Sequence, residues 1–234
     1  MLDKNFWKKY FSDYDLLNNL IPYDDLLESI CNKAEIKTGD LVLDAGSGTG
    51  NLSLKIASFG GKIVGIDYSE EGIRLHKQKQ QNAELILHNL TEPLPFVDNT
   101  FDVIVSNNVL YTISRAQRLP IFKEFHRVLK TGGIIVIANL AEHFNSFVIF
   151  RDHLKRYRKK FGLLKTLYHI FSLLLPTVRI FYYNYLIKSE NKTGSYDFFS
   201  KDEQKEYLKK SGFSIVTDTE MHYSGQSVLN KAIK

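Results

Sequence analysis

The chain has 234 residues, 44% hydrophobic and 24% charged, and a formal net charge of +5. This length can bury one sizeable core and does not require two independent domains. A single cysteine, Cys31, excludes an intramolecular disulfide and a thiolate metal cluster. The N-terminal residues lack the apolar run of a signal peptide, so we expect a cytoplasmic protein.

Short apolar and β-branched runs alternate with helical patterns over the first 140 residues. The expected strands are Leu41–Asp44, Lys62–Asp67, Glu84–His88, Phe101–Ser106 and Gly133–Asn139. The expected helices include one from Tyr23 to Ala34 and one through Leu129 that ends at Thr131-Gly132-Gly133. This alternation predicts a parallel sheet with helices on both faces.

The C-terminal part follows a different order. A helix is expected at Lys201–Ser211, followed by strands at Phe213–Met221 and Gln226–Ile233. The short connection through Ser224 and Gly225 predicts an antiparallel hairpin. About sixty residues before this ending are too many for an ordinary connection, so we predict a helical insertion over 141–195. The core would then comprise 1–140 plus 196–234, with 1–34 as a helical cover.

A glycine-rich turn follows the first expected strand and leads into a helix expected at Asn51–Ser58. Its glycines, at 46, 48 and 50, allow a sharp turn and the close approach of a ligand. A dinucleotide fingerprint would place its third glycine at position 51, which holds Asn51. Asp44 would repel a pyrophosphate but attract an ammonium group, so we expect a ligand with a cation at this point.

A second acid lies at the end of the second expected strand. Asp67 comes nineteen residues after Gly48, where a carboxylate can accept hydrogen bonds from both ribose hydroxyls. This spacing indicates a nucleoside ligand. The alternative is that Asp67 caps a helix that starts near Ser69.

Together with residues 94–110, these motifs resemble the class I S-adenosylmethionine-dependent methyltransferases, in their small-molecule, methyltransferase-11-like branch. The similarity covers residues about 35–140 and resumes at about 196–234. The resemblance implies an α/β fold, a Rossmann-like three-layer sandwich. Its seven-stranded, mostly parallel sheet would have the order 3-2-1-4-5-7-6 with an antiparallel last strand, and a helical lid insertion would be added. It also implies S-adenosyl-L-methionine as cofactor and S-adenosyl-L-homocysteine as product.

The resemblance further implies which residues bind the cofactor. Around the methionine moiety it places Asp44, Ala45, Gly46, Ser47, Gly48 and Gly50. It places Asp67 on the ribose, and Tyr68, Asn89 and Leu90 near the adenine, with Asn89 where the family usually has an acid.

Two further segments complete the expected site. Asn107, Asn108 and Leu110 would line the pocket where the sulfonium meets the acceptor, unless the polar residues only cap a helix. Tyr14, from an aromatic N-terminal segment that also holds Tyr10, would cover the cofactor, unless this segment only docks hydrophobically.

The predicted chemistry needs little from the protein beyond alignment and removal of water, because a sulfonium methyl group is already activated. His143 and Tyr111 are candidate general bases, with structural roles as the alternative. The run 106–111 lacks the Asn/Asp-Pro-Pro-aromatic motif of the branches that methylate DNA and protein glutamine, which argues against those substrates. The histidines show no metal-ligand spacing, and we predict no metal.

The expected insertion holds the positive charge of the chain. From Ala141 to Glu190 there are nine basic and three acidic residues, a net charge of +6. One helix should carry an aromatic stripe from Phe147 to Phe161, and a second, from Leu163 to Leu175, should stop at Pro176. The longest charge-free run is thirteen residues, too short to span a bilayer.

Three interpretations of the insertion follow. It is a lid whose aromatic faces pack on the core, an interfacial helix pair on an anionic membrane, or, less in keeping with the sequence, a nucleic-acid contact. We predict methyl transfer to a small, hydrophobic or aromatic acceptor. The alternatives are a peripheral-membrane enzyme with a lipid or quinone-type acceptor, an NAD-dependent oxidoreductase, and a protein that binds the cofactor without turnover. No oligomeric state is predicted.

Overall fold

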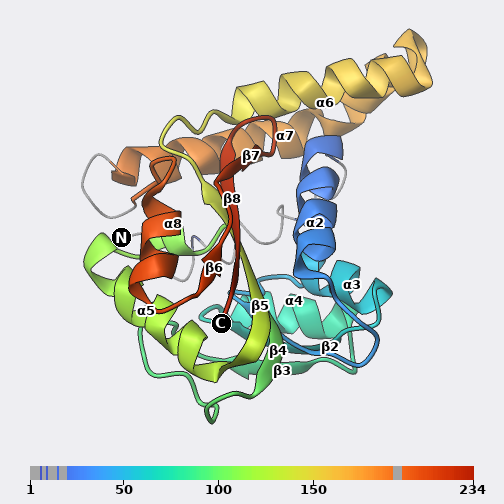
Figure 1. Cartoon of the computed structure of the whole chain (residues 1–234). Helices are drawn as coiled ribbons and strands as arrows, with labels where there is room; N and C mark the ends of the chain where they lie inside the picture. The colour runs from blue at the N-terminus through green and yellow to red at the C-terminus, as the bar shows by residue number, and fades with distance from the viewer. Residues whose placement is uncertain (1–5, 7–8, 10–14, 16–19, 192–196) are drawn as a thin grey trace.

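The computed structural model describes residues 6, 9, 15, 20–191 and 197–234. A central sheet lies between two layers of helices, and two long helices cross one edge of it (Figure 1). The first half of the chain forms α2 (Ile21–Ala34), β1 (Leu41–Ala45), α3 (Asn51–Ser58), β2 (Lys62–Asp67), α4 (Glu70–Lys79), β3 (Glu84–Leu87), β4 (Phe101–Asn107) and the short 3-10 helix η2 (Leu110–Thr112). The second half forms α5 (Arg115–Val128), β5 (Leu129–Leu140), α6 (Ser146–Phe161), α7 (Leu163–Asn191), α8 (Glu203–Lys210), β6 (Ile215–Val216), β7 (Glu220–His222) and β8 (Ser227–Ile233).

The sheet has the order β3-β2-β1-β4-β5-β8-β6, and β7 also pairs with β8. Strands β1 to β5 are parallel, and β8 runs antiparallel to β5. This confirms the predicted order, with β8 as the last, antiparallel strand. Open α/β sheets bind ligands at the edge formed by the carboxyl ends of their parallel strands, so the candidate site is sought at this carboxyl edge of the sheet.

One expected strand is broken in two. The run 213–221 forms β6 and β7, because Asn230 on β8 takes over the hydrogen bonds between them. Its amide nitrogen donates to the carbonyl of Thr217 at 3.2 Å and to the hydroxyl of Thr219 at 3.1 Å. Because Thr217 keeps a backbone hydrogen bond of 2.9 Å to Lys231, the Asn230 side chain replaces only part of the backbone ladder. No residue pattern in 213–221 indicates this break.

Strand β5 is longer than expected. It begins at Leu129 rather than Gly133, and α5 ends at Val128. Leu129 already pairs with Phe101 on β4, before the register shifts between Phe101 and Val103. The two glycines expected to end the helix lie instead within an irregular part of the strand, where Gly132 has a φ of +77°.

The helices form two layers. Helices α2, α3 and α4 cover one face of the sheet, and α5 and α8 cover the other (Figure 1). Helix α2 begins with a proline at its first turn, and buries Leu26, Ile30 and Ala34 completely. Helix α2 packs on β4 and β5. Its N-terminal end lies next to α6 and α7, at the carboxyl edge of the sheet (Figure 1).

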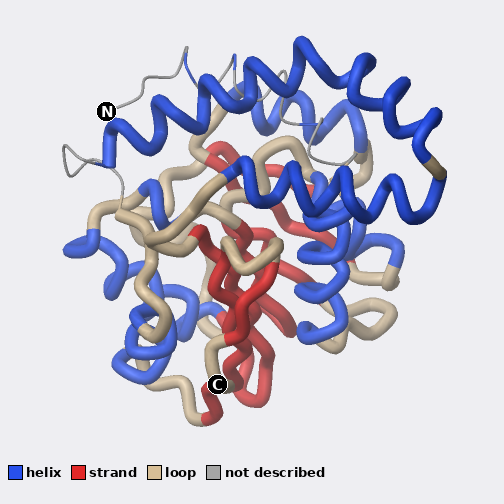
Figure 2. The backbone as a smooth tube through the Cα atoms, turned by 90° about the horizontal axis from the view of Figure 1, so that it is seen from above, coloured by secondary structure: helices blue, strands red, loops and turns tan. Residues whose placement is uncertain are grey.

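Helices α6 and α7 pack side by side across the carboxyl edge, as the view from above shows (Figure 2). The predicted stop at Pro176 is wrong, since α7 continues to Asn191. Its halves, Leu163–Leu174 and Thr177–Ser189, meet at an angle of 59°. Proline removes one backbone donor and crowds the preceding turn, which bends a helix without always ending it. No single described helix is long and apolar enough to cross a membrane; only the two bent halves together have the length and composition.

Candidate functional site

The first acid of the site, Asp44, is buried at the end of β1. Its carboxylate accepts a hydrogen bond of 2.6 Å from the hydroxyl of Ser53 on α3. Burial raises the pKa of Asp44 to about 7, and the nearby charge of Asp67 adds to this rise. Sequence reasoning missed Ser53, which could have been found as a polar residue on the inward face of the helix after the turn.

The second acid, Asp67, fastens the glycine-rich turn to β2. One carboxylate oxygen accepts from the amide of Gly48 at 2.8 Å and the other from the amide of Ser69 at 2.8 Å. The N-cap is Ser69, whose hydroxyl accepts from Gly72, and Asp67 adds a hydrogen bond from the Ser69 amide just before the helix, so the capping alternative for Asp67 stays open beside a ribose contact. Burial raises the pKa of Asp67, against the opposing effect of its backbone hydrogen bonds.

The carboxylate of Asp67 fits a ribose. An ionised carboxylate offers about four lone-pair positions, and these two amides use two of them. Asp67 is only half-buried, beside the exposed Tyr68. The backbone amide of Tyr68 also stabilises this carboxylate, and ribose hydroxyls arriving from solvent can donate to the positions that remain.

A buried histidine lies beneath the glycine-rich turn. His76 from α4 is fully buried, and its Nδ1 lies 3.2 Å from the hydroxyl of Ser47. A Cβ on Gly50, where φ is +82°, would overlap the His76 ring. Burial lowers the pKa of His76, so its neutral form supports the turn. A lone histidine in a helix gives no sequence signal for such a role, and this residue was missed.

Asp15, a described residue before α2, contacts the same turn. Asp15 accepts a hydrogen bond of 3.0 Å from the hydroxyl of Thr49 and forms an ion pair of 2.5 Å with Lys79 on α4. Lys79 also donates to Asn51 at 2.8 Å. Tyr14, predicted to cover the cofactor, lies outside the described residues, as do Trp7, Tyr10 and Phe11.

The residues expected near the adenine follow β3. The side-chain oxygen of Asn89 accepts from the amide of Thr91 at 3.0 Å, closing a local turn. Leu90 is buried, and the Tyr68 side chain on the facing loop is 55% exposed. An adenine amino group that donated to the Asn89 oxygen would therefore compete with this turn.

Two asparagines end β4 with unusual surroundings. The side-chain oxygens of Asn107 and Asn108 are buried, and neither accepts a hydrogen bond from any residue that the structure describes. Asn108 has a φ of +56°. They do not cap η2, which begins after Val109 without a side-chain cap. Because buried polar atoms are nearly always paired, these oxygens indicate a place for a ligand or water.

An aromatic cluster includes Tyr111, which follows these asparagines in η2. The buried ring of Tyr111 stacks on Phe198 at 5.4 Å, and Phe144 lies 5.9 Å from Phe198. His143, in the loop between β5 and α6, is exposed. The two candidate bases therefore differ in setting, with Tyr111 inside an aromatic cluster and His143 in contact with solvent.

A buried arginine binds the backbone next to this aromatic cluster. Arg118 on α5 donates to the carbonyls of Leu110 and Ile113 at 3.1 Å, and forms an ion pair of 2.9 Å with Glu203 on α8. Its guanidinium lies 4.0 Å above the ring of Phe199. Burial lowers the pKa of Arg118, but Glu203 counteracts this effect. Sequence reasoning missed Arg118, since an arginine in a surface helix is normally solvated.

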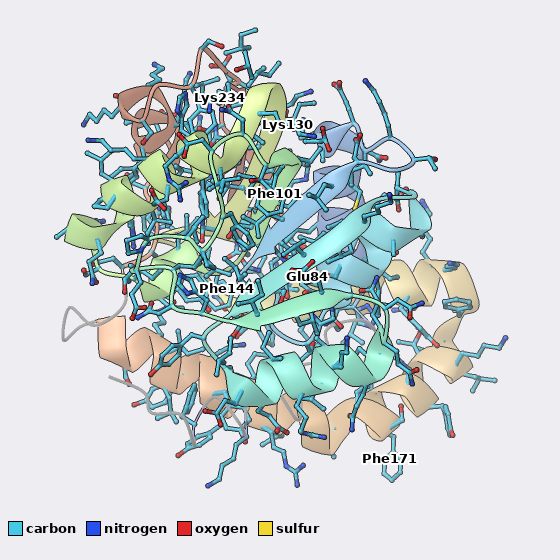
Figure 3. The ribbon with its side chains drawn as sticks, turned by 90° about the horizontal axis from the view of Figure 1, so that it is seen from below. Glu84, Phe101, Lys130, Phe144, Phe171 and Lys234 are labelled. Atoms are coloured by element: carbon cyan, nitrogen blue, oxygen red, sulfur yellow. The ribbon has the colours of Figure 1, made fainter. Side chains whose placement is uncertain are left out.

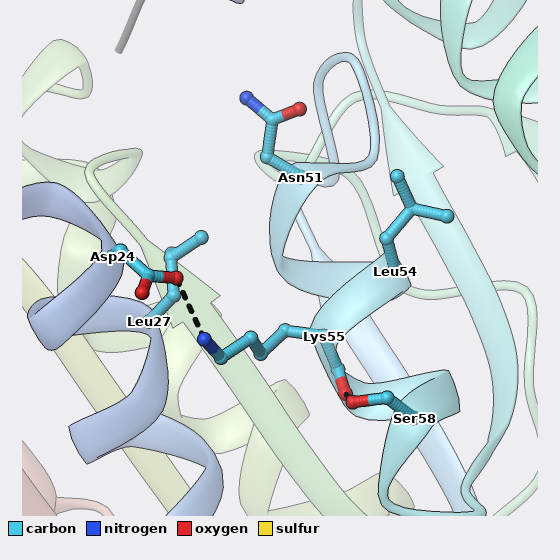
Figure 4. Close-up of a pocket in the computed structure, with 6 residues that line it drawn as sticks. All are labelled: Asp24, Leu27, Asn51, Leu54, Lys55 and Ser58. Carbon is cyan, nitrogen blue, oxygen red and sulfur yellow. Dashed lines mark hydrogen bonds and ion pairs between the residues drawn. The ribbon is translucent and has the colours of Figure 1, made fainter. Parts of the chain in front are cut away.

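A surface depression of about 290 Å³ lies elsewhere, between α2 and α3 (Figure 4). It is lined by Asp24, Leu27, Asn51, Leu54, Lys55 and Ser58. An ion pair of 2.6 Å between Lys55 and Asp24 joins its two walls. Its lining includes neither Asp67 nor the asparagines of β4, so we assign it to the packing of the two helices.

The sheet order, the fastened glycine-rich turn and the ribose-compatible acid define a Rossmann-like enzyme that uses a nucleoside cofactor. Residues 36–212, about three quarters of the chain, match the family described as the methyltransferase domain. The chain belongs to this family and is an S-adenosylmethionine-dependent methyltransferase. This membership selects methyl transfer over the NAD-dependent alternative.

Curated relatives and solved structures agree with this assignment. Demethylmenaquinone methyltransferases from Oceanobacillus iheyensis and Staphylococcus haemolyticus are 24% and 28% identical to the chain. The alignments cover 90% and 88% of this chain, and 86% and 82% of those proteins. A crystal structure of a SAM-dependent methyltransferase from Aquifex aeolicus has a TM-score of 0.62 at 17% identity, covering 100% of this chain and 99% of that one. This last likeness concerns the fold alone.

Proposed function

We propose that this enzyme methylates a lipophilic aromatic acceptor of the quinol type. Two observations carry the proposal: the aromatic cluster of Tyr111, Phe144 and Phe198, and the buried amide oxygens at the end of β4 that accept no hydrogen bond from the described residues. Flat aromatic rings favour contact with other aromatic side chains. The name of the two bacterial relatives, demethylmenaquinone methyltransferase, supports an acceptor of this class.

Each cofactor-side residue has a proposed task. Asp67 binds the ribose hydroxyls, and Gly48, held by the same carboxylate, shapes the turn around the methionine moiety. Asp44 attracts the ammonium group, directly or through water. The amide oxygens of Asn107 and Asn108 accept hydrogen bonds near the sulfonium end. We also propose that the N–H groups of Asn89 donate to an adenine ring nitrogen, since its oxygen already serves Thr91.

The acceptor side follows from the same edge. When bound, S-adenosylmethionine supplies a methyl group activated by its sulfonium sulfur. The ring carbon that gains this methyl must lose a proton, and we propose that His143, the exposed candidate base, takes it up. Tyr111 then serves as a wall for the acceptor ring. S-adenosylhomocysteine is the second product.

This proposal assigns the chain two parts. Residues 1–140 plus 196–234 form the cofactor-binding core, with 1–34 as its cover, and 141–195 form the acceptor insertion. A tailed quinol resides in a membrane, and the insertion, which crosses the carboxyl edge of the sheet, lies where such an acceptor would enter. Nucleic acid has no place in this arrangement, although the insertion is basic.

A methylation assay tests the acceptor. The chain and S-adenosylmethionine are incubated with a reduced prenylated naphthoquinone in detergent micelles, and the product is followed by mass spectrometry. We expect the prenylated quinol to gain one methyl group, and a water-soluble catechol to gain little. Binding of the cofactor without methylation of the prenylated quinol would refute the acceptor class.

Matched variants test the cofactor residues. Asp67→Ala should weaken S-adenosylhomocysteine binding by more than about 100-fold, because two charge-assisted hydrogen bonds are each worth roughly 1.5–3 kcal/mol. Glu84→Ala, which removes an exposed acid on the neighbouring strand β3, should bind normally. Equal binding by both variants, measured by calorimetry, would remove Asp67 from the site.

A further inference from the structure

Helix α7 has two opposite faces, one buried and one exposed. One face, with Thr166, Leu173, Ile180 and Ile187, is buried at intervals of seven residues. The opposite face repeats with the same interval and is exposed along Leu164, Phe171, Val178 and Tyr185. Seven residues are nearly two helical turns, so each set forms one stripe along the helix.

The exposed face is large and apolar. Leu164 is 83% exposed, Tyr168 76% and Phe171 79%, and Leu167, Leu174 and Tyr182 extend the same surface. The side chain of Phe171 projects away from the body of the protein (Figure 3). We call this surface, formed by Leu164, Leu167, Tyr168, Phe171, Leu174, Val178, Tyr182 and Tyr185, the α7 stripe. Contiguous apolar surface of this extent marks an interaction site.

The charged residues of α7 within the length of the stripe are basic. Between residues 163 and 189, α7 carries Lys165, Arg179 and Lys188 and no acidic residue. At the tip where α6 turns into α7, the exposed Lys159 and Lys160 stand directly before the exposed Phe161 and Leu163. Apolar and aromatic side chains flanked by lysine and arginine are the composition of helices that lie in a lipid interface.

We propose that the α7 stripe docks on an anionic lipid bilayer, with the helix lying along the surface and its basic residues at the headgroups. The rest of the molecule then hangs below the membrane, with the carboxyl edge of the sheet facing it, since α6 and α7 cross that edge (Figures 1 and 2). This inference deepens the proposed function, and rests on it for the reason why the acceptor site faces the lipid.

Charge selects the lipid over a second copy of the chain. Two copies joined stripe to stripe would bring together two insertions that each carry a net charge of +6. An anionic bilayer instead neutralises this charge while it buries the same apolar side chains. The bend of 59° at the middle of α7 keeps it from crossing as one straight helix, which agrees with an interfacial position.

Vesicle sedimentation tests the docking directly. The full chain is mixed with phosphatidylcholine vesicles, with or without about one third phosphatidylglycerol, at low and high salt. We expect binding to the anionic vesicles, weakened by salt and by the paired change Lys159→Glu and Lys160→Glu. Leu164→Ser combined with Phe171→Ser should reduce binding about tenfold or more, because these side chains supply the apolar contact.

A matched control separates docking from general stickiness. Val97 is 78% exposed and precedes β4, at the sheet edge opposite the insertion. Val97→Ser should bind vesicles like the wild type, and thermal unfolding should show that all variants fold. Vesicle binding unchanged by the double serine variant, or absent in the wild type, would overturn the proposal. So would a wild-type dimer, seen by sedimentation, that the double serine variant dissociates without any effect on vesicles.

The outcomes also separate this inference from the proposed function. If the chain binds anionic vesicles but methylates no prenylated quinol, the acceptor proposal is wrong and the docking surface stands. If it methylates the quinol in detergent but ignores vesicles, the docking surface is wrong and the acceptor proposal stands.

Discussion

The carboxyl edge of the sheet and the α6–α7 insertion use their side chains in opposite ways. At the edge, several polar groups from different elements are paired with one another, as Gly48 and Ser69 are with Asp67, and Ser53 with Asp44. On α7, large apolar groups such as Phe171 face solvent. The geometry of the edge is therefore set by hydrogen bonds within the chain, whereas the exposed face of α7 requires a surface outside the chain to cover it.

The insertion is nevertheless firmly attached at one point. His153 on α6 is fully buried, and its Nδ1 accepts a hydrogen bond of 3.2 Å from the amide of Ile21, the first residue of α2. Its Nε2 lies 2.9 Å from Nε2 of His169 on α7, whose ring stacks on Tyr157 at 4.1 Å. A neutral histidine pair thus joins both helices of the insertion to the core.

The largest expected effect tests whether internal contacts specify the edge. Gly50→Ala should destabilise the fold by roughly 3 kcal/mol, as measured by urea unfolding. A positive φ costs an alanine about 1–2 kcal/mol, and overlap with the buried His76 ring adds about as much. Cofactor affinity should fall as well, because the turn that Asp67 holds must shift.

Gly132→Ala provides the control for this comparison. Gly132 has a φ of +77°, close to that of Gly50, but nothing lies within 4 Å of a Cβ placed there. It should cost only about 1 kcal/mol, the backbone contribution alone. Equal losses in the two variants would show that His76 does not shape the turn.

The next effect concerns the attachment of the insertion. Burial, together with the nearby His169 and Arg156, lowers the pKa of His153 to about 4. In the unfolded chain this histidine takes up a proton near pH 6.5, so the folded state is favoured above that pH and loses stability as the pH falls toward 4. Between pH 7.5 and pH 5 the loss from this residue should be about 2 kcal/mol.

Urea unfolding at both pH values checks this prediction. His153→Gln keeps an acceptor for Ile21 but cannot titrate, so the loss on acidification should shrink by about the same amount. His143→Gln, at an exposed position, should leave it unchanged. If the free energy of unfolding of His153→Gln kept the same pH dependence, a group other than His153 would be responsible for it.

The edge was more predictable from sequence than the insertion, for a physical reason. The positions of Asp44, Gly48 and Asp67 follow from local requirements, namely a strand end, a sharp turn and a carboxylate at fixed spacing. These requirements leave a residue pattern along the chain. The residues that support the site from other helices leave no such pattern, since His76 and Arg118 act through tertiary contacts that sequence spacing does not reveal.

The insertion shows the limits of periodicity. An aromatic stripe on α6 was expected from Phe147 to Phe161, yet Phe147 is 59% exposed, and the fully enclosed positions are Ile149 and His153. The expectation that the apolar residues of the insertion pack on the core fails for the outer face of α7. Apolar periodicity predicts that a face is covered, but does not say whether the chain or a partner covers it.

The smallest expected effect is a change of cofactor affinity with pH, which should occur at the carboxyl edge and not at the insertion. Burial and the charge of Asp67 raise the pKa of Asp44 to about 7 in the chain without ligand. The ammonium group of the cofactor favours the ionised carboxylate, whose share falls from about nine tenths at pH 8 to about one tenth at pH 6. Affinity for S-adenosylhomocysteine should therefore be about tenfold weaker at pH 6, and Asp44→Asn should bind weakly with little dependence on pH.

Vesicle binding gives the counterpart of this measurement. Lysine and arginine keep their charge over the same interval, and burial keeps His153 neutral down to a pKa of about 4. The docking of the α7 stripe on anionic vesicles should therefore hardly change between pH 8 and pH 6. A cofactor affinity that is equally constant would mean that Asp44 is not the group that meets the ammonium. If cofactor affinity and vesicle binding both weakened at pH 6, the edge and the insertion would respond to pH as one unit.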